Sequence, residues 1–166
     1  MSIKPLCVII GSIIKELVFD DVHGIIVTCD CDETIKFIAD WNLLKESLGY
    51  VIDNAYKNTH EKGVVTINCW KDASDVYIHV SNEGAGIEPS LAERVFDGLF
   101  IPDLLHHRQG TGLSLAIAKE IIEEHNGQIS CRNLDSRGTL YEIALKDVIK
   151  RHRGQTFSND KQLGQN

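Results

Sequence analysis

Three segments of the chain place apolar residues three or four positions apart, which is the spacing of an amphipathic helix. The first segment covers Leu6 to Phe19. The second covers Trp41 to about Thr59 and follows Asp40, a residue type favoured at helix N-termini. The third lies between Gly112 and Gly127, and Gly127 is expected to end it. Its apolar positions are Leu113, Leu115, Ile117, Ile121 and Ile122.

Shorter segments carry the alternating or β-branched apolar pattern of strands. They are Gly24 to Cys31, Val64 to Trp70, Val76 to Ser81, Gln128 to Asn133 and Thr139 to Leu145. A short polar connection joins the second and third of these strands, which predicts a hairpin. Ser90 to Phe96 is predicted to be a short helix. The segment Gly98 to Gln109 has no clear period and is long for a connector, which is typical of a lid.

A glycine-bearing loop precedes the third helix, with Gly110 and Gly112 on either side of Thr111. Glycine lets the backbone approach a ligand closely, and a helix start offers unpaired N–H groups and a partial positive charge. The loop is therefore a candidate phosphate site. A Gly-x-Gly before a helix is also often a simple tight turn. Two stronger fingerprints are absent, since Leu115 replaces the third glycine of dinucleotide-binding loops and the sequence contains no G-x-x-x-x-G-K-[ST].

Polar and aromatic residues border the apolar stripe of the second helix. The stripe is Leu44, Leu48, Val51, Ile52 and Ala55, and the bordering residues are Ser47, Tyr50, Asn54, Lys57 and Asn58. The Asn54 amide and the Lys57 ammonium lie about one turn apart and can serve a metal-bound phosphate, although a solvated helix edge has the same pattern. The segment Asn82 to Ile87, N-E-G-A-G-I, follows a predicted strand, so a polar side chain there can be directed into a pocket.

The composition limits the classes of function. A chain of 166 residues with 43 % hydrophobic residues suits one globular domain with a core. The net charge of -7 argues against nucleic acid as a partner, because binding a polyanion needs an excess of lysine and arginine. No apolar run is long enough to span a bilayer and no secretory leader is recognisable, so we expect a cytoplasmic fragment without direct membrane contact. The five cysteines form no zinc-type cluster and are expected to be buried thiols.

Several segments carry a resemblance to a known family, in the family's order and spacing. They are Tyr50 to Thr59, Asn82 to Ile87, the phenylalanine-bearing Arg94 to Phe100, Gly110 to Leu115 and Arg137 to Tyr141. Together they resemble the ATP-binding catalytic domain of sensor histidine kinases, in the GHKL superfamily that also contains DNA gyrase, heat-shock chaperone ATPases and anti-sigma kinases. One such segment is weak evidence, whereas the ordered set is specific.

The resemblance implies a fold as well as a function. It implies an α/β protein of the Bergerat type, a two-layer α/β sandwich in which a mixed sheet of about five strands packs against about three helices. Residues 1–148 would form this ATP-binding catalytic domain. Residues 149–166, which are polar and aperiodic, would form a disordered tail.

The resemblance also implies a role for each matching residue. The Asn54 side-chain oxygen would coordinate Mg²⁺, Lys57 would lie near the phosphates of ATP, and Tyr50 occupies a catalytic position. Asn82 replaces the aspartate that accepts a hydrogen bond from the adenine amino group; its oxygen can still accept that bond, and its NH₂ group can donate to the neighbouring ring nitrogen. The remaining base-binding residues would be Gly84, Gly86, Ile87 and Thr139. The phosphate-binding residues would be Gly110, Thr111, Gly112 and Leu113.

Tyr50 is the main departure from the family pattern. Gyrase-like ATPases and the serine kinases of this superfamily have a glutamate there as general base, and histidine kinases usually have an asparagine. An imidazole nitrogen has its own lone pair, so its phosphorylation needs positioning and charge neutralisation more than a base. Tyr50 therefore argues against gyrase-like hydrolysis and is tolerable in a histidine kinase. A catalytically silent nucleotide-binding module, or pseudokinase, is the alternative, because Asn82 and Ser114 also depart from the family.

The acceptor histidine of the family lies on a dimerisation helix, followed by an acidic residue, a basic residue, threonine and proline. None of the seven histidines has this context, and His60 followed by Glu61 comes nearest. We therefore expect a catalytic domain that binds ATP and Mg²⁺ but does not phosphorylate itself. The γ-phosphoryl group would pass to a histidine on a dimerisation domain of the same protein, with a response regulator downstream.

Overall fold

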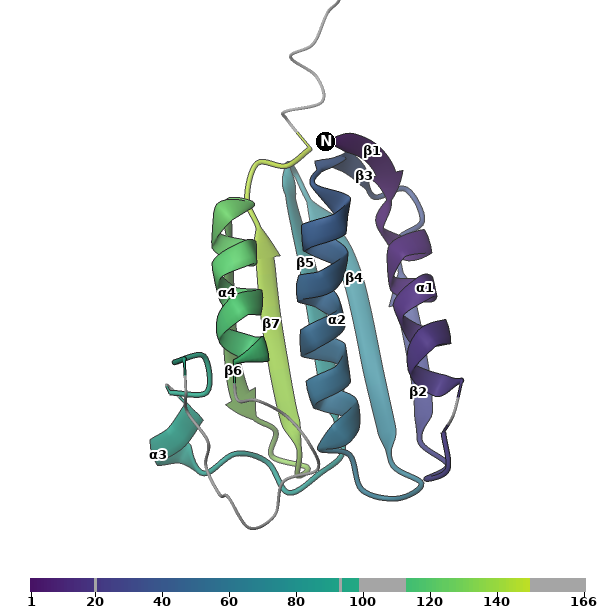
Figure 1. Ribbon diagram of the computed structural model, residues 1–166, viewed down its shortest axis with the longest axis vertical. Helices are drawn as coiled ribbons and strands as arrows, with labels where there is room; N and C mark the ends of the chain where they lie inside the picture. The colour runs from purple at the N-terminus through teal and green to yellow at the C-terminus, as the bar shows by residue number, and fades with distance from the viewer. Residues whose placement is uncertain (20, 93, 99–112, 150–166) are drawn as a thin grey trace, which may run out of the picture.

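The computed structural model describes residues 1–19, 21–92, 94–98 and 113–149. Three longer helices, α1 (Leu6–Val18), α2 (Trp41–Lys57) and α4 (Ser114–Glu124), form one layer over a sheet (Figure 1). A one-turn helix, α3, covers Pro89–Ala92. The strands of the sheet are β2 (Ile26–Cys31), β4 (Val64–Asp72), β5 (Asp75–Asn82), β6 (Gly127–Asn133) and β7 (Thr139–Leu145). The predicted two-layer α/β sandwich is confirmed.

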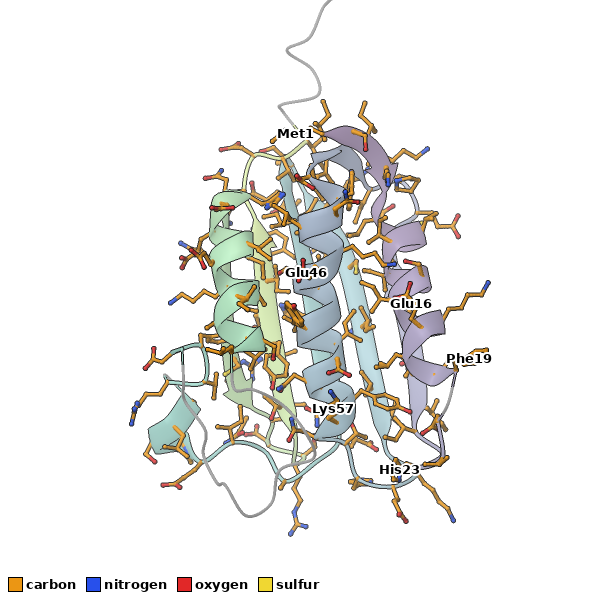
Figure 2. All side chains as sticks on the ribbon, in the orientation of Figure 1. Met1, Glu16, Phe19, His23, Glu46 and Lys57 are labelled. Carbon is orange, nitrogen blue, oxygen red and sulfur yellow. The ribbon has the colours of Figure 1, made fainter. Side chains whose placement is uncertain are left out.

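The strands of this sheet run in the order β2-β4-β5-β7-β6. β2 pairs with β4 in parallel and the other neighbours are antiparallel, so the sheet is mixed, as predicted. A further pairing has no counterpart in the sequence prediction. β1 (Ser2–Pro5) and β3 (Lys36–Ala39) form a small antiparallel sheet at the end of the molecule where Met1 lies (Figures 1 and 2). Four-residue strands are too short to show a clear period in the sequence.

The face of the sheet that packs against the helices forms the core. Alternate residues of the β4–β5 hairpin are buried there, namely Val65, Ile67, Cys69, Val76, Ile78 and Val80. The predicted apolar stripe of α2 is buried along its whole length. The prediction for α4 was partly wrong, because Ile117 is 39 % exposed and Ala118 is buried instead. α4 turns Ala118 toward α2, where its carbonyl accepts a hydrogen bond from the buried Ser47 hydroxyl (3.0 Å).

Local signals account for the start of α2 and the end of α4. Asp40 caps α2 as predicted, because its side-chain oxygen accepts hydrogen bonds from the backbone nitrogens of the second and third helical residues (3.2 and 3.3 Å). α4 ends differently from the prediction: it stops at Glu124, Asn126 has the positive φ (58°), and Gly127 already begins β6. The Asn126 side chain donates to the Lys146 carbonyl (2.9 Å), and asparagine tolerates this conformation better than most residues. No helix in the described residues is long and apolar enough to cross a membrane.

Three further segments refine the predicted boundaries. The predicted helix from Ser90 to Phe96 is only the single turn of α3, and residues 94–98 form turns and a bend. Val148 is buried and Ile149 packs against the core, so the packing continues through residue 149. Beyond Gly98 the predicted lid lies outside the described residues, as does the predicted tail from residue 150 onward.

The cysteines differ in exposure. Cys69 on β4 is buried, as expected, but Cys29 on β2 is exposed. The other three, Cys7, Cys31 and Cys131, are partly buried. Cys29 departs from the expectation because β2 is an edge strand, which the helix layer covers less completely than a central strand.

The candidate residues gather at one edge of the sheet. Asn82 ends β5, Thr139 begins β7 and Asn133 ends β6. The register pairs Thr139 with both Asn82 and Asn133, so the three form one row across three strands. Lys57, at the C-terminal end of α2, lies at the same end of the molecule (Figure 2). This edge therefore brings together residues from distant parts of the sequence.

Candidate functional site

Asn82 is the most informative residue at this edge. Its side chain is buried, and its Nδ2 donates a hydrogen bond to the Asn58 carbonyl (3.1 Å). Its Oδ1 is equally buried but has no hydrogen-bond partner in the described residues. A buried oxygen without a donor costs about 1–3 kcal/mol, so proteins rarely retain one without a reason. Because Nδ2 is engaged by Asn58, the amide presents its oxygen as an acceptor for a ligand.

Two glycines allow the backbone around Asn82 to pack closely. A Cβ on Gly84 would lie 2.1 Å from the Asn58 carbonyl oxygen, and a Cβ on Gly138 would lie 1.9 Å from the Asn82 carbonyl oxygen. Gly138 also has a φ of +122°, which side-chain-bearing residues rarely adopt. These glycines therefore fix the distance between the end of β5, the end of α2 and the β6–β7 turn.

Asn133 holds the loop that follows β5. Its Oδ1 accepts a hydrogen bond from the Ile87 backbone nitrogen (2.7 Å), and its Nδ2 donates to the Ile87 carbonyl. Gly86, with a φ of +80°, lies directly against this amide, because a Cβ there would be 2.8 Å from the Asn133 Oδ1. Asn133 is not predicted from the sequence. A polar residue before a turn is common, and nothing in the local pattern shows that this one binds a loop 46 residues away.

Asn54 lies on the adjoining face of α2, one turn before Asn58. Its Oδ1 accepts a hydrogen bond from the Tyr141 hydroxyl (2.7 Å) and a longer one from the Asn58 Nδ2 (3.2 Å). Tyr141 is buried in β7, and this burial raises the pKa of its hydroxyl far above the usual range. This role of Tyr141 is not predicted from the sequence, because the residue has the position of an ordinary inward-facing strand residue.

Lys57 and Tyr50 are both engaged with carboxylates of α2. The Lys57 ammonium lies 2.6 Å from the Asp53 carboxylate, and about half of each of these side chains is shielded from solvent. The Tyr50 hydroxyl donates to the Glu46 carboxylate (2.7 Å), and this hydrogen bond is the main reason that the pKa of Tyr50 is raised. Figure 2 shows Glu46 near the middle of α2 and Lys57 at its end. The Tyr50 hydroxyl thus points away from the Lys57 end of the helix.

The predicted phosphate loop is described only at its last residue. Leu113 stands before α4 with a helical backbone, its carbonyl accepts from the Ile117 nitrogen (3.0 Å), and its side chain makes no cap. The first backbone N–H groups of α4 therefore lack a side-chain cap from this residue and can receive an anion. Gly110, Thr111 and Gly112 lie outside the described residues.

The described residues can contribute to a metal site only in part. They contain no group of three or more histidine, cysteine, aspartate or glutamate side chains that could hold a metal ion. The Asn54 amide oxygen is a hard ligand of the kind Mg²⁺ accepts, and Mg²⁺ usually takes one or two protein ligands, with water and substrate phosphates completing its shell. The residues therefore fit a magnesium ion that arrives with a nucleotide.

Comparison with known protein families gives this geometry its context. Residues 39–149 match the family of histidine kinase-, DNA gyrase B- and HSP90-like ATPases. The chain belongs to this family. The match begins just before α2 and ends after β7, so it includes Asn54, Asn82, Asn133 and Tyr141. The superfamily inferred from the sequence motifs is confirmed.

Proteins similar to this chain include sensor kinases. The chain is 35 % identical over 108 residues to the sensor protein SrrB of Staphylococcus aureus, which is 64 % of this chain but only 18 % of SrrB. The nucleotide-free catalytic domain of the histidine kinase ThkA is 25 % identical, with a TM-score of 0.79 over 90 % of this chain and 97 % of that one. The mycobacterial sensor histidine kinase MprB has the same fold (TM-score 0.78, 21 % identity, 87 % and 97 % covered). The chain thus spans less than a fifth of SrrB, and in sequence and fold it resembles the catalytic domains of sensor kinases.

Proposed function

We propose that this domain binds ATP together with Mg²⁺ and transfers the γ-phosphoryl group to a histidine on a dimerisation domain of the full-length protein. The observation that carries the proposal is the buried Oδ1 of Asn82, which no donor in the described part of the chain satisfies. The exocyclic amino group of adenine is a donor that could satisfy this oxygen. Thr139 is buried beside Asn82 and is available to support the base.

The phosphates would lie toward the end of α2 and the start of α4. Lys57 supplies a positive charge there, once it exchanges Asp53 for a phosphate, and the first N–H groups of α4 supply partial positive charge. Asn54 would be the protein ligand of Mg²⁺, which, when bound, neutralises charge on the phosphate oxygens. Each of these groups favours the phosphoryl transfer by positioning and electrostatics.

The acceptor chemistry needs no general base from this domain. An imidazole nitrogen attacks the γ-phosphorus with its own lone pair, a P–N bond forms, the bond to the bridging oxygen breaks, and ADP leaves with that electron pair. The structure supports this reading, since the Tyr50 hydroxyl is held by Glu46 and no carboxylate occupies its position. A response regulator would receive the phosphoryl group next. The related kinase ThkA is known in complex with the response regulator TrrA.

A direct test mixes the domain, ATP and Mg²⁺ with the dimerisation domain of the same full-length protein and measures acid-labile phosphohistidine. Label on the partner histidine is expected, with none on the domain incubated alone. Tight nucleotide binding without any label would instead establish the silent regulatory module.

A pair of lysine variants on α2 provides the matched control. Lys57→Met should weaken ATP binding, because it removes the charge at the phosphate end of the helix. Lys45→Met removes the same charge from the other half of α2, where Lys45 pairs with Glu16 (2.7 Å), and should leave binding unchanged. Equal effects of the two variants would contradict the assigned position of the phosphates.

A further inference from the structure

Tyr141 connects the sheet to the candidate metal ligand. Its ring is buried in the core, and its hydroxyl donates to the Asn54 Oδ1 at 2.7 Å across 87 residues of sequence. An amide oxygen can only accept and the Tyr141 hydroxyl can donate, so the chemistry of the two groups fixes the direction of this hydrogen bond. If Asn54 turned away, the hydroxyl would be left buried without its partner, which is an unfavourable state.

The second hydrogen bond to the same oxygen is of a different kind. Asn58 Nδ2 approaches the Asn54 Oδ1 at 3.2 Å, but it also donates to the Asn54 backbone carbonyl at 2.8 Å. Asn58 is exposed, so it can give up the longer contact and keep the shorter one or turn to water. An amide oxygen has two lone pairs. Tyr141 therefore engages one lone pair of the Asn54 Oδ1 firmly, while the lone pair that Asn58 engages can become free for a bound cation.

We propose that Tyr141 is a positioning residue that holds the Asn54 side-chain oxygen ready for a divalent cation bound to the nucleotide, with Asn58 releasing the second lone pair to that cation. The inference rests on the proposed function. The Tyr141 hydroxyl acts only through Asn54. A phenylalanine at position 141 would fill the same space but could not orient the Asn54 amide. When the side chain that binds the cation is already held in place, less conformational entropy is lost on binding, so the affinity for the cation is higher.

The test measures cation binding directly. Mn²⁺ is titrated into the domain saturated with a non-hydrolysable ATP analogue, and free Mn²⁺ is followed by electron paramagnetic resonance. Tyr141→Phe should weaken Mn²⁺ binding by about three- to tenfold, the loss expected for one oriented hydrogen bond. The affinity of the analogue in the presence of EDTA should not change. Tyr77 lies on the neighbouring strand β5, and its hydroxyl is hydrogen-bonded to Lys146 (3.1 Å). Tyr77→Phe should therefore change neither the Mn²⁺ affinity nor the affinity for the analogue.

A double-mutant cycle separates orientation from general damage. In an Asn54→Ala background, Tyr141→Phe should cause no further loss of Mn²⁺ affinity, because Tyr141 acts only through Asn54. Unchanged or tighter Mn²⁺ binding in Tyr141→Phe, additive losses in the cycle, or an equal loss with and without metal would each overturn the inference. A wild-type domain that fails to bind the analogue at all would instead defeat the proposed function.

Discussion

The two ends of strands β5 and β7 satisfy their polar groups in contrasting ways. At one end Asn82 and Thr139 are buried, and the Asn82 Oδ1 has no hydrogen-bond partner among the residues that the structure describes. At the other end the Asp75 carboxylate is fully engaged: it accepts from the Asp147 backbone nitrogen (2.9 Å) and from the Lys146 ammonium (3.0 Å). Among the described residues, the first end keeps an acceptor without a donor, whereas at the second end Asp75 accepts from two donors. The contrast distinguishes the proposed binding edge, around Asn82 and Thr139, from a structural edge, around Asp75, on the same strands.

The largest effect should come from closing the space at the binding edge. Gly138→Ala places a methyl group against the Asn82 carbonyl at a positive φ, so we expect a loss of about 3 kcal/mol in unfolding free energy and loss of nucleotide binding. Denaturant unfolding measures the change in unfolding free energy, and calorimetry measures nucleotide binding. Gly49→Ala on α2 meets nothing within 4 Å and should stabilise the protein by up to about 1 kcal/mol. A harmless Gly138→Ala would show that the close approach is not required.

Removing the unmet acceptor should affect binding far more than folding. Asn82→Ala deletes an oxygen that accepts from no described residue and removes one hydrogen bond from Nδ2, so the unfolding free energy should change by less than about 1 kcal/mol. ATP affinity should fall by about tenfold to a hundredfold, because the adenine amino group is left buried without an acceptor. Calorimetry measures the ATP affinity and thermal unfolding measures the stability of the same preparation. A variant that unfolds readily while binding ATP normally would reverse the assignment of this edge.

Asn133→Ala tests the loop that the binding edge depends on. Loss of both hydrogen bonds to Ile87 should weaken ATP binding by about three- to tenfold, since the loop that faces the base loses its fixed position. Asn68→Ala changes an exposed asparagine on β4 and serves as the control for the loss of an amide from the sheet. Nucleotide titration of both variants should show an effect only for Asn133→Ala.

The smallest effect concerns the structural edge and appears only in acid. Hydrogen bonding from the Asp147 backbone nitrogen, followed by that from Lys146, lowers the pKa of Asp75 below its ordinary value of 3.8. A carboxyl group with a lowered folded-state pKa stabilises the fold above 3.8, and this contribution is lost as the pH falls through the lowered value. Asp75→Asn should therefore show a shallower loss of stability in acid than the wild type. ATP affinity at neutral pH should be the same in both proteins.

Local patterns were enough to predict the parts of the fold that depend on neighbouring residues. Asp40 caps α2 because its partners are two and three positions away, and the β4–β5 hairpin follows from alternation over two adjoining segments. Asn54 and Asn82 were found because they stand within recognisable motifs. Their roles stay predictions, but the structure brings both to the same edge of the molecule.

Long-range pairing explains what the sequence could not predict. Asn133 and Tyr141 contact partners 46 and 87 residues away. Asn133 belongs to no motif, and the Arg137 to Tyr141 segment does not indicate a contact with Asn54. Ile117 continues the apolar spacing of α4, yet it is exposed because the contact with α2 is made through Ala118. Such choices depend on how two elements face each other, which periodicity within one element does not reveal.

The Asn82 Oδ1 is proposed to accept a hydrogen bond from the amino group of adenine, and a comparison of two nucleotides tests this role most directly. Inosine triphosphate carries an oxygen where ATP carries that amino group, so it would bring a second acceptor against Oδ1. Isothermal titration calorimetry of the wild-type domain should show ATP binding at least about tenfold more tightly than inosine triphosphate, with the difference lost in Asn82→Ala. Equal affinity of the wild-type domain for the two nucleotides would contradict the account.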